Sequence, residues 1–179
     1  MQDNLISWQD LMKFEGLIDI ISVDSKGWPY AKNMHNILTN SNKAGSFLQI
    51  KPIRKEIIFF KTKHILGYLK GKLNSERITI ACDDYIHQGY TLHYIYKFLT
   101  TNQKVPVNNL VFFSNGFSTE ILKKTPQATL LDKESCPTEI RDFHTYAVPL
   151  DKKHDALFEE YRKIRHNNDI NFPQKHRWI

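Results

Sequence analysis

Short apolar segments that alternate with segments of helical periodicity constrain the fold of this chain more than any other feature. Five segments have the length and composition of strands: residues 17–23, 46–50, 77–82, 110–113 and 128–131. Helical spacing follows the first of them over residues 29–38, and it follows the third at Leu92, Ile95, Tyr96 and Leu99. Strands that alternate with helices imply a mainly parallel sheet with helices on both faces. The sequence therefore predicts an α/β fold with a twisted, Rossmann-like core.

Three further helices are expected. Ser7 and Asp10 have the spacing of a capping box, which predicts a short helix from Trp8. Ser118 and Asp151 are expected to cap two later helices. The second lies within the last 29 residues of the chain, 151–179. These elements would flank the sheet.

The length of 179 residues and the hydrophobic content of 41% suit one compact domain. We expect a single domain over residues 1–179, with a core at about 7–150 and a C-terminal helix with a possible hood at 151–179. Residues 1–13 lack the basic and apolar pattern of a secretory signal, and no apolar run suggests a membrane span, so we expect a cytoplasmic protein. Cys82 and Cys136 are too few for a disulfide framework, and Cys82 is expected to be inert core.

The chain carries a net charge of +6 and has a pI near 9.2, which suits anionic partners such as nucleotides, phosphorylated sugars or nucleic acid. Part of the positive charge lies in residues 51–72, and the rest clusters near the end of the chain. Basic residues between Lys51 and Lys63 are candidates for a mobile loop that closes over a site.

Residues 78–92 are the most informative stretch for function. A buried-type strand ends in Asp83 and Asp84, and then Gly89 and Thr91 stand at the start of a helix. The start of a helix offers unpaired N–H groups and partial positive charge, so this turn is suited to a phosphate. The two carboxylates are suited to sugar hydroxyls, and to a Mg²⁺ ion carried by a pyrophosphate. Together these features predict a sugar-phosphate site.

This stretch resembles the phosphoribosyl pyrophosphate (PRPP) signature of the type I phosphoribosyltransferases, an apolar strand followed by Asp/Glu-Asp, four residues, Gly, one residue, Thr/Ser and Leu. The resemblance implies that Asp83 and Asp84 hold the ribose hydroxyls and, through PRPP, the metal. The residues it assigns to the 5-phosphate are His87, Gln88, Gly89, Tyr90 and Thr91.

A second segment supports the resemblance. Ser25, Lys26 and Gly27 follow the first strand as the pyrophosphate loop of that family does, with a small residue, Ala31, in the following helix. Lys26 would neutralise the pyrophosphate, while Gly27 exposes backbone N–H groups to it.

The N-terminal helix and the aromatic tail look most like the purine-salvage (hypoxanthine/xanthine/guanine) branch, in which the chain termini form a small hood over the base. By that resemblance Phe172 or Trp178 would stack on the base, and Asn115 would read its edge. The motif departs from the branch at three places: His87 stands where Asp is usual, Gln88 replaces Thr, and Tyr90 puts a ring where a smaller or basic residue is common. The identity of the base stays open.

The resemblance implies a Mg²⁺-dependent glycosyltransferase of nucleotide metabolism that transfers 5-phosphoribose from PRPP to a nitrogenous base, with a purine as the expected base, and releases pyrophosphate. His87, Asp83 and Asp84 would be the catalytic residues. The alternative is a module of the same fold that binds PRPP or a nucleotide as a sensor without turnover. A third option is hydrolysis, with His87 activating water. A homo-oligomer and a nucleic-acid partner are compatible with the sequence.

Overall fold

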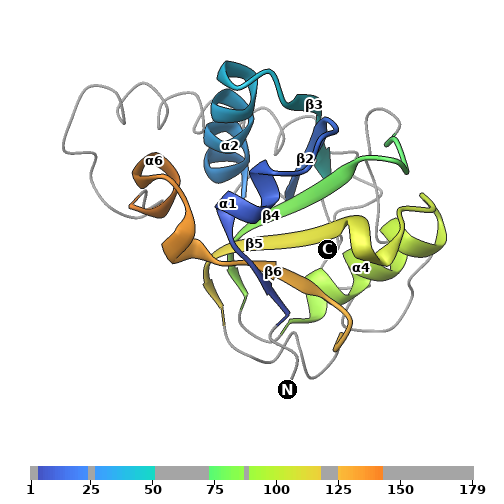
Figure 1. Cartoon of the computed structure of the whole chain (residues 1–179). Coiled ribbons are helices and arrows are strands. Elements are labelled where there is room, and N and C mark those ends of the chain that lie inside the picture. The colour runs from blue at the N-terminus through green and yellow to red at the C-terminus, as the bar shows by residue number, and fades with distance from the viewer. Residues whose placement is uncertain (1–3, 24–26, 51–72, 87–88, 118–124, 143–179) are drawn as a thin grey trace, which may run out of the picture.

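A computed structural model of the chain describes residues 4–23, 27–50, 73–86, 89–117 and 125–142. Six strands form one sheet in the order β1-β6-β5-β4-β2-β3, and each neighbouring pair is parallel (Figure 1). The strands are β1 (Leu5–Ile6), β2 (Ile18–Val23), β3 (Ala44–Ile50), β4 (Ile78–Ile86), β5 (Leu110–Phe117) and β6 (Thr129–Leu131). The predicted α/β fold with a mainly parallel, Rossmann-like sheet is thus confirmed.

The order of the strands reverses between β2 and β4. From β2 the chain moves outward to β3, whereas from β4 it moves the other way to β5 and then β6. In open parallel sheets such a reversal leaves a crevice at the carboxyl ends of the two central strands, because the connections that follow them lie on opposite faces. The fold therefore places the ends of β2 and β4 together.

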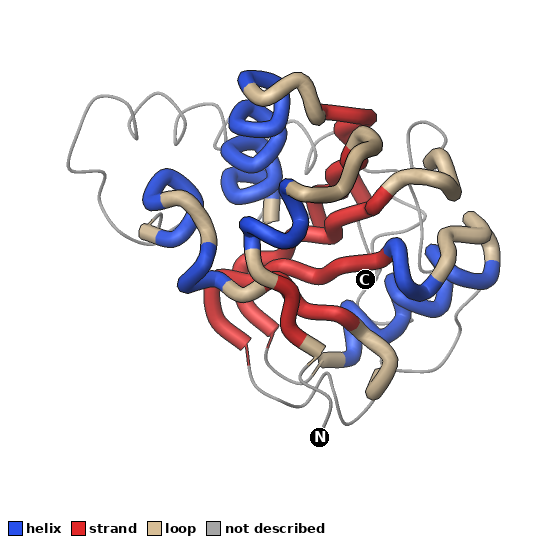
Figure 2. Tube along the Cα trace, in the orientation of Figure 1, coloured by secondary structure: helices blue, strands red, loops and turns tan. Residues whose placement is uncertain are grey.

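Helices cover both faces of the sheet, as Figure 2 shows. The helical elements are α1 (Trp8–Met12), α2 (Trp28–Asn40), α4 (Tyr90–Thr101), η2 (Val107–Asn109), η3 (Lys133–Ser135) and α6 (Thr138–Arg141). Leu11, Met34 and Ile140, from α1, α2 and α6, join one buried cluster with Ile20 and Ile80 of the sheet. On the other face, α4 buries three apolar residues against a second cluster: Leu92, Ile95 and Leu99.

The elements expected from the sequence form with small changes of length. Ser7 caps α1 by accepting a hydrogen bond from the Asp10 amide, at 3.0 Å, which confirms the predicted cap. Strands β4 and β5 each run four residues beyond the predicted ends, and β1 and α6 were not predicted. The helices expected after Ser118 and Asp151 begin in segments outside the described residues, 118–124 and 143–179.

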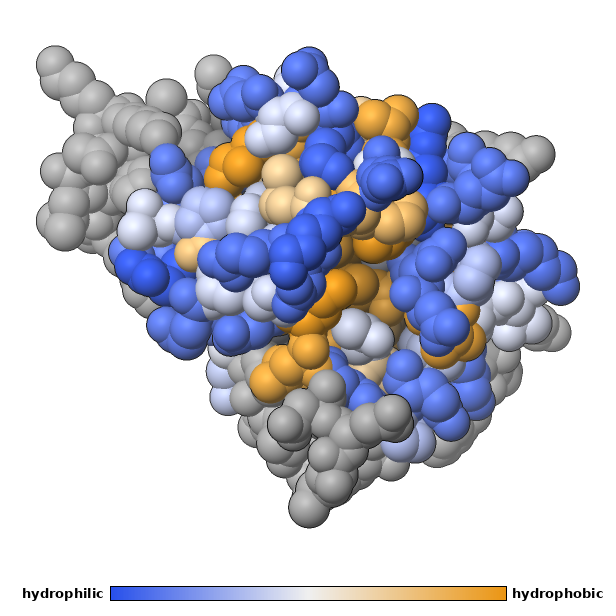
Figure 3. All heavy atoms as spheres, viewed as in Figure 1, coloured by the Kyte–Doolittle hydropathy of each residue, from blue (hydrophilic) through white to orange (hydrophobic). Residues whose placement is uncertain are grey.

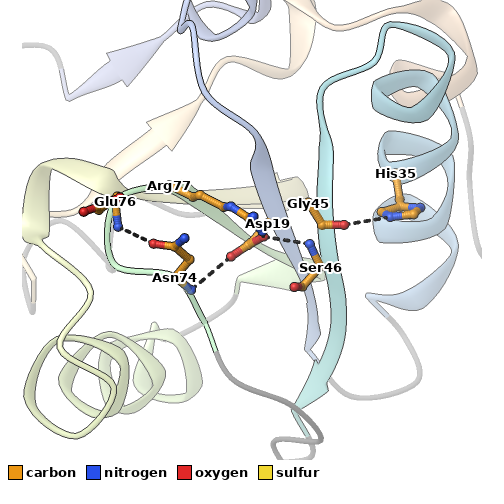
Figure 4. Close-up of polar contacts among 7 residues, drawn as sticks. All are labelled: Asp19, His35, Gly45, Ser46, Asn74, Glu76 and Arg77. Carbon is orange, nitrogen blue, oxygen red and sulfur yellow. Dashed lines mark hydrogen bonds and ion pairs between the residues drawn. The ribbon is translucent and has the colours of Figure 1, made fainter.

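A buried carboxylate holds the amino ends of the central strands together (Figure 4). Asp19 of β2 is fully buried and accepts hydrogen bonds from the Ser46 amide of β3, at 2.7 Å, and from the Asn74 amide, at 3.3 Å. The Arg77 guanidinium pairs with the same carboxylate at 3.2 Å. A Cβ on Gly45 would stand 2.1 Å from an Asp19 carboxylate oxygen, so only glycine fits beside it. Asp19 therefore ties β2 to β3 and to the start of β4.

The sheet ends at β1 on one side, and this edge faces the viewer in the space-filling picture. Apolar surface lies in the middle of that face with hydrophilic side chains around it (Figure 3). Leu5 of β1 is 52% exposed, while Leu130 and Leu131 of β6 beneath are buried. The two residues of β1 pair with Leu130 and Leu131 and form the edge of the sheet.

Candidate functional site

Gly27 lies where the loop after β2 meets the middle of β4, at Cys82. A Cβ on Gly27 would stand 2.0 Å from the Cys82 carbonyl oxygen and 2.8 Å from the Val23 carbonyl oxygen. Gly27 also donates its amide to the Val23 carbonyl, at 3.1 Å, which closes the turn before α2. Because any side chain would collide with two backbone oxygens, the absence of a Cβ is what lets this turn lie against β4. The turn that contains Gly27 is hereafter the β2 turn.

The two aspartates come directly after Cys82, but they lie inside β4 and not beyond its end. Asp83 pairs in register with Ser114 and Tyr85 with Gly116, so the strand continues past both carboxylates. Successive side chains in a strand point to opposite faces. Ala81 belongs to the cluster beneath α4 and Cys82 to the cluster beneath α2, which places Asp83 on the α4 face and Asp84 on the α2 face.

Each carboxylate also shapes the local backbone. Asp83 accepts a hydrogen bond from the Asp84 amide, and Asp84 accepts one from the Tyr85 amide, both at 2.8 Å. Asp84 is buried, with 8% of its surface exposed, whereas Asp83 is half-buried. The pair therefore straddles the end of the sheet, with Asp84 on the side of the β2 turn and Asp83 on the side of α4.

The turn before α4 has the backbone geometry that a glycine signature predicts. Gly89 adopts φ 72° and ψ 0°, in the left-handed region, and no side chain caps α4. Its carbonyl accepts the His93 amide, at 2.9 Å, as the first turn of the helix forms. Thr91 lies half-buried in that turn. The amide groups at the start of α4 thus have no side-chain cap from Gly89, and a helix start of this kind favours an anion. The turn at Gly89 is hereafter the β4 turn.

An exposed aromatic ring stands beside the aspartates, and the sequence analysis did not single it out. Tyr85 is 55% exposed, and a Cβ on Gly116 would stand 2.8 and 2.9 Å from two of its ring carbons. The ring therefore rests on the glycine of the neighbouring strand. Asn115, the predicted base-reading residue, lies half-buried in β5 next to Gly116 and not after the strand. The paired positions Tyr85 and Gly116 become evident only when β4 and β5 are aligned.

Several predicted site residues lie outside the described residues. They are Ser25, Lys26, His87, Gln88, Phe172 and Trp178, together with residues 51–63 and the side chain of Tyr90. The structure thus brings Gly27, in the loop after β2, close to Asp83 and Asp84 of β4, 56 residues further along the chain, and it leaves the hood untested.

The thiol groups of Cys82 and Cys136 are buried in the core. Cys82 is fully buried and its thiol lies 3.6 Å from the Met34 sulfur. Burial raises the pKa of the Cys82 thiol well above its ordinary value. Burial, aided by Asp132 and Glu134, likewise raises the pKa of Cys136 to about 12. Since the thiolate is the reactive form, the predicted inert role of Cys82 agrees with this environment.

Carboxylate oxygens are the donors that Mg²⁺ prefers, and Asp83 and Asp84 supply them at the end of β4. Among the residues that the structure describes, no group of three or more His, Cys, Asp or Glu side chains could hold a metal ion. An indirect role of Asp83 and Asp84 toward Mg²⁺, through a bound pyrophosphate, stays a prediction.

The sequence matches no known protein-family model and no curated protein. Within the described ranges, no helix is both long enough and apolar enough to cross a membrane.

Proposed function

We propose that this protein is a phosphoribosyltransferase that moves 5-phosphoribose from PRPP to a nitrogenous base, with release of pyrophosphate. One observation carries the proposal: the β2 turn packs on the carbonyl of Cys82, directly beside Asp83 and Asp84. This packing sets a glycine turn beside two carboxylates, and the chain continues from β4 through Gly89 into the start of α4. These are the groups that a sugar bearing phosphate at one end and pyrophosphate at the other requires.

The division of the two carboxylates between the faces of the sheet supports a specific arrangement of PRPP. The 5-phosphate would lie on the β4 turn, at the positive end of α4, and the pyrophosphate on the β2 turn. The ribose would then span the edge of β4, with Asp83 reaching its hydroxyls from the α4 side and Asp84 from the α2 side. Lys26 would neutralise the pyrophosphate.

In the proposed reaction a nitrogen atom of the base forms a bond to the anomeric carbon of the ribose. The bond from that carbon to the pyrophosphate oxygen breaks, and its electron pair leaves with the pyrophosphate. Asp83 and Asp84 would stabilise the positive charge that develops on the ribose, and His87 would accept the proton that the base loses. A bound Mg²⁺ ion would supply charge neutralisation for the pyrophosphate.

Tyr85 offers a surface for the base. Its ring rests on Gly116 and is exposed on the α4 face of the sheet, the face to which Asp83 points, whereas Asn115 points to the α2 face. Planar bases stack on aromatic rings, so we include Tyr85 with Asn115, Phe172 and Trp178 among the proposed base contacts. We propose a purine as the acceptor and the cytoplasm as the location of the protein.

The test is pyrophosphate release from PRPP and Mg²⁺ over a panel of purines and pyrimidines, with ribose 5-phosphate measured in parallel. Release that depends on one base is the expected result. Binding of PRPP without release of pyrophosphate would indicate a sensor and not a transferase. Formation of ribose 5-phosphate without added base would indicate hydrolysis. The Asp83→Asn variant is the control for contaminating activity.

A further inference from the structure

His93 makes a polar contact that crosses from α4 to the segment before β6. Its Nδ1 atom lies 2.7 Å from the Oγ1 atom of Thr125, a hydrogen bond in which either atom can be the donor. Thr125 is buried, with 1% of its surface exposed. A buried hydroxyl costs free energy unless it is hydrogen-bonded, so a partner at this position has a structural value that a surface contact lacks.

The same two residues are bonded to the elements on either side of them. The His93 amide donates to the Gly89 carbonyl, at 2.9 Å, and the Thr125 carbonyl accepts the Ala128 amide, also at 2.9 Å. The side chain of Asn4 donates to the Pro126 carbonyl, next to Thr125. A continuous path of hydrogen bonds therefore runs from the β4 turn to the segment that enters β6.

We propose that His93 is a positioning residue for the phosphate turn, which it holds at a fixed place through Thr125. The inference rests on the proposed function, because it takes the β4 turn as the place of the 5-phosphate. Gly89 has a left-handed backbone and no side chain, so a side-chain restraint on the direction of the neighbouring amides must come from another residue. The contact from His93 to Thr125 provides that restraint one helical turn away.

Loss of the contact between His93 and Thr125 should have a different effect from loss of the apolar packing of α4. Apolar residues already hold the body of α4 to the sheet, since Leu92, Ile95 and Leu99 are buried. Loss of the His93 contact is therefore expected to loosen the first turn of α4 and to leave its last turn in place.

The experiment compares four variants with the wild-type chain: His93→Ala, Thr125→Val, their double mutant, and His93→Asn, whose amide can replace the Nδ1 atom. Thr100→Ala is the matched control, because the Thr100 hydroxyl bonds to the Tyr96 carbonyl within the same helix. Two quantities are measured: hydrogen exchange at the residue 93 and Asn102 amides, and calorimetric binding of PRPP with Mg²⁺.

We expect His93→Ala and Thr125→Val each to speed exchange at the residue 93 amide by about tenfold, with no change at Asn102. Both should weaken PRPP binding by on the order of tenfold, the double mutant should add little, and His93→Asn should restore binding in part. An unchanged exchange rate at the residue 93 amide, or an equal rise in the exchange rate at both amides, would overturn the positioning role. If the wild-type chain binds no PRPP, the proposed function fails, and the exchange data alone decide whether His93 orders the turn.

Discussion

Gly27 and Cys82 approach so closely that a Cβ on Gly27 would lie 2.0 Å from the Cys82 carbonyl oxygen. No side-chain motion can relieve this contact, because the atom it meets belongs to the backbone of β4. The loop after β2 is thereby fixed against β4, at the point where the order of the strands reverses. The proposed site depends on this contact.

Replacement of Gly27 by Ala is expected to force the β2 turn away from β4. We expect a loss of at least about 2 kcal/mol in the free energy of unfolding, since overpacking of this kind moves backbone. Urea denaturation measures it. Gly16→Ala is the matched control, because its Cβ would meet only the Phe14 ring, which can rotate away. Equal stability of Gly27→Ala and wild type would show that the turn has room to shift.

Gly89 is needed for its backbone conformation. With φ at 72°, Gly89→Ala should cost about 1–2 kcal/mol of stability, and Gly89→Asn should cost less because Asn tolerates the left-handed region better. The same order, Ala worse than Asn, is expected for PRPP affinity. Calorimetry of the two variants checks the order of PRPP affinity, and urea titration checks the order of stability. A Gly89→Asn variant less stable than Gly89→Ala would contradict a left-handed turn.

The aspartates are expected to matter for ligand more than for folding. Asp83→Asn and Asp84→Asn each keep an oxygen that can accept the following amide, so the fold should persist. Loss of a charged hydrogen bond to the ribose is worth about 1.5–3 kcal/mol, which corresponds to a fall of roughly 10- to 150-fold in kcat/KM. Steady-state kinetics with PRPP measures the fall. Full activity in both variants would exclude a role for the pair.

Asp19 should behave in the opposite way, as a residue of stability. Asp19→Ala would leave the Ser46 and Asn74 amides and Arg77 without their buried acceptor, and we expect a loss of about 3 kcal/mol. Asp10→Ala is the control. Because Asp10 pairs with Lys13 on the surface, the urea midpoint of this variant should differ little from that of the wild type. Similar midpoints for the two variants would mean that the Asp19 network does not hold the strands.

These contrasts show what the sequence could and could not predict. Alternating strands and helices predicted the sheet, because each apolar run has the length of one strand. The end of β4 was placed too early, since ladder pairing with β5 continues through Asp83 and Tyr85 whatever their polarity. The Asp19 network was not predicted, because its members, Asp19 included, come from three separate segments. Gly27 was expected to expose amides to a ligand, and its contact with Cys82 could not be foreseen without the strand order.

The buried thiols give a pH dependence with a definite sign. The pKa of Cys136 is raised to about 12 from an ordinary value of 9.0, and that of Cys82 is raised too. An unfolded thiol ionises first, so the stabilisation is complete below about pH 9 and is lost as the pH rises toward 12. Urea unfolding at several alkaline pH values should show a steeper fall for wild type than for Cys136→Ala. Parallel curves would contradict the shift.

The most direct test of the account is a calorimetric titration of the full chain with PRPP in the presence of Mg²⁺, repeated with Gly27→Ala at a temperature where that variant is folded. The account predicts one PRPP bound per chain by the wild type, with a dissociation constant in the micromolar to millimolar range, and much weaker binding by the variant. Absence of heat with PRPP and with every nucleoside monophosphate tried, under conditions where the wild type is folded, would contradict it.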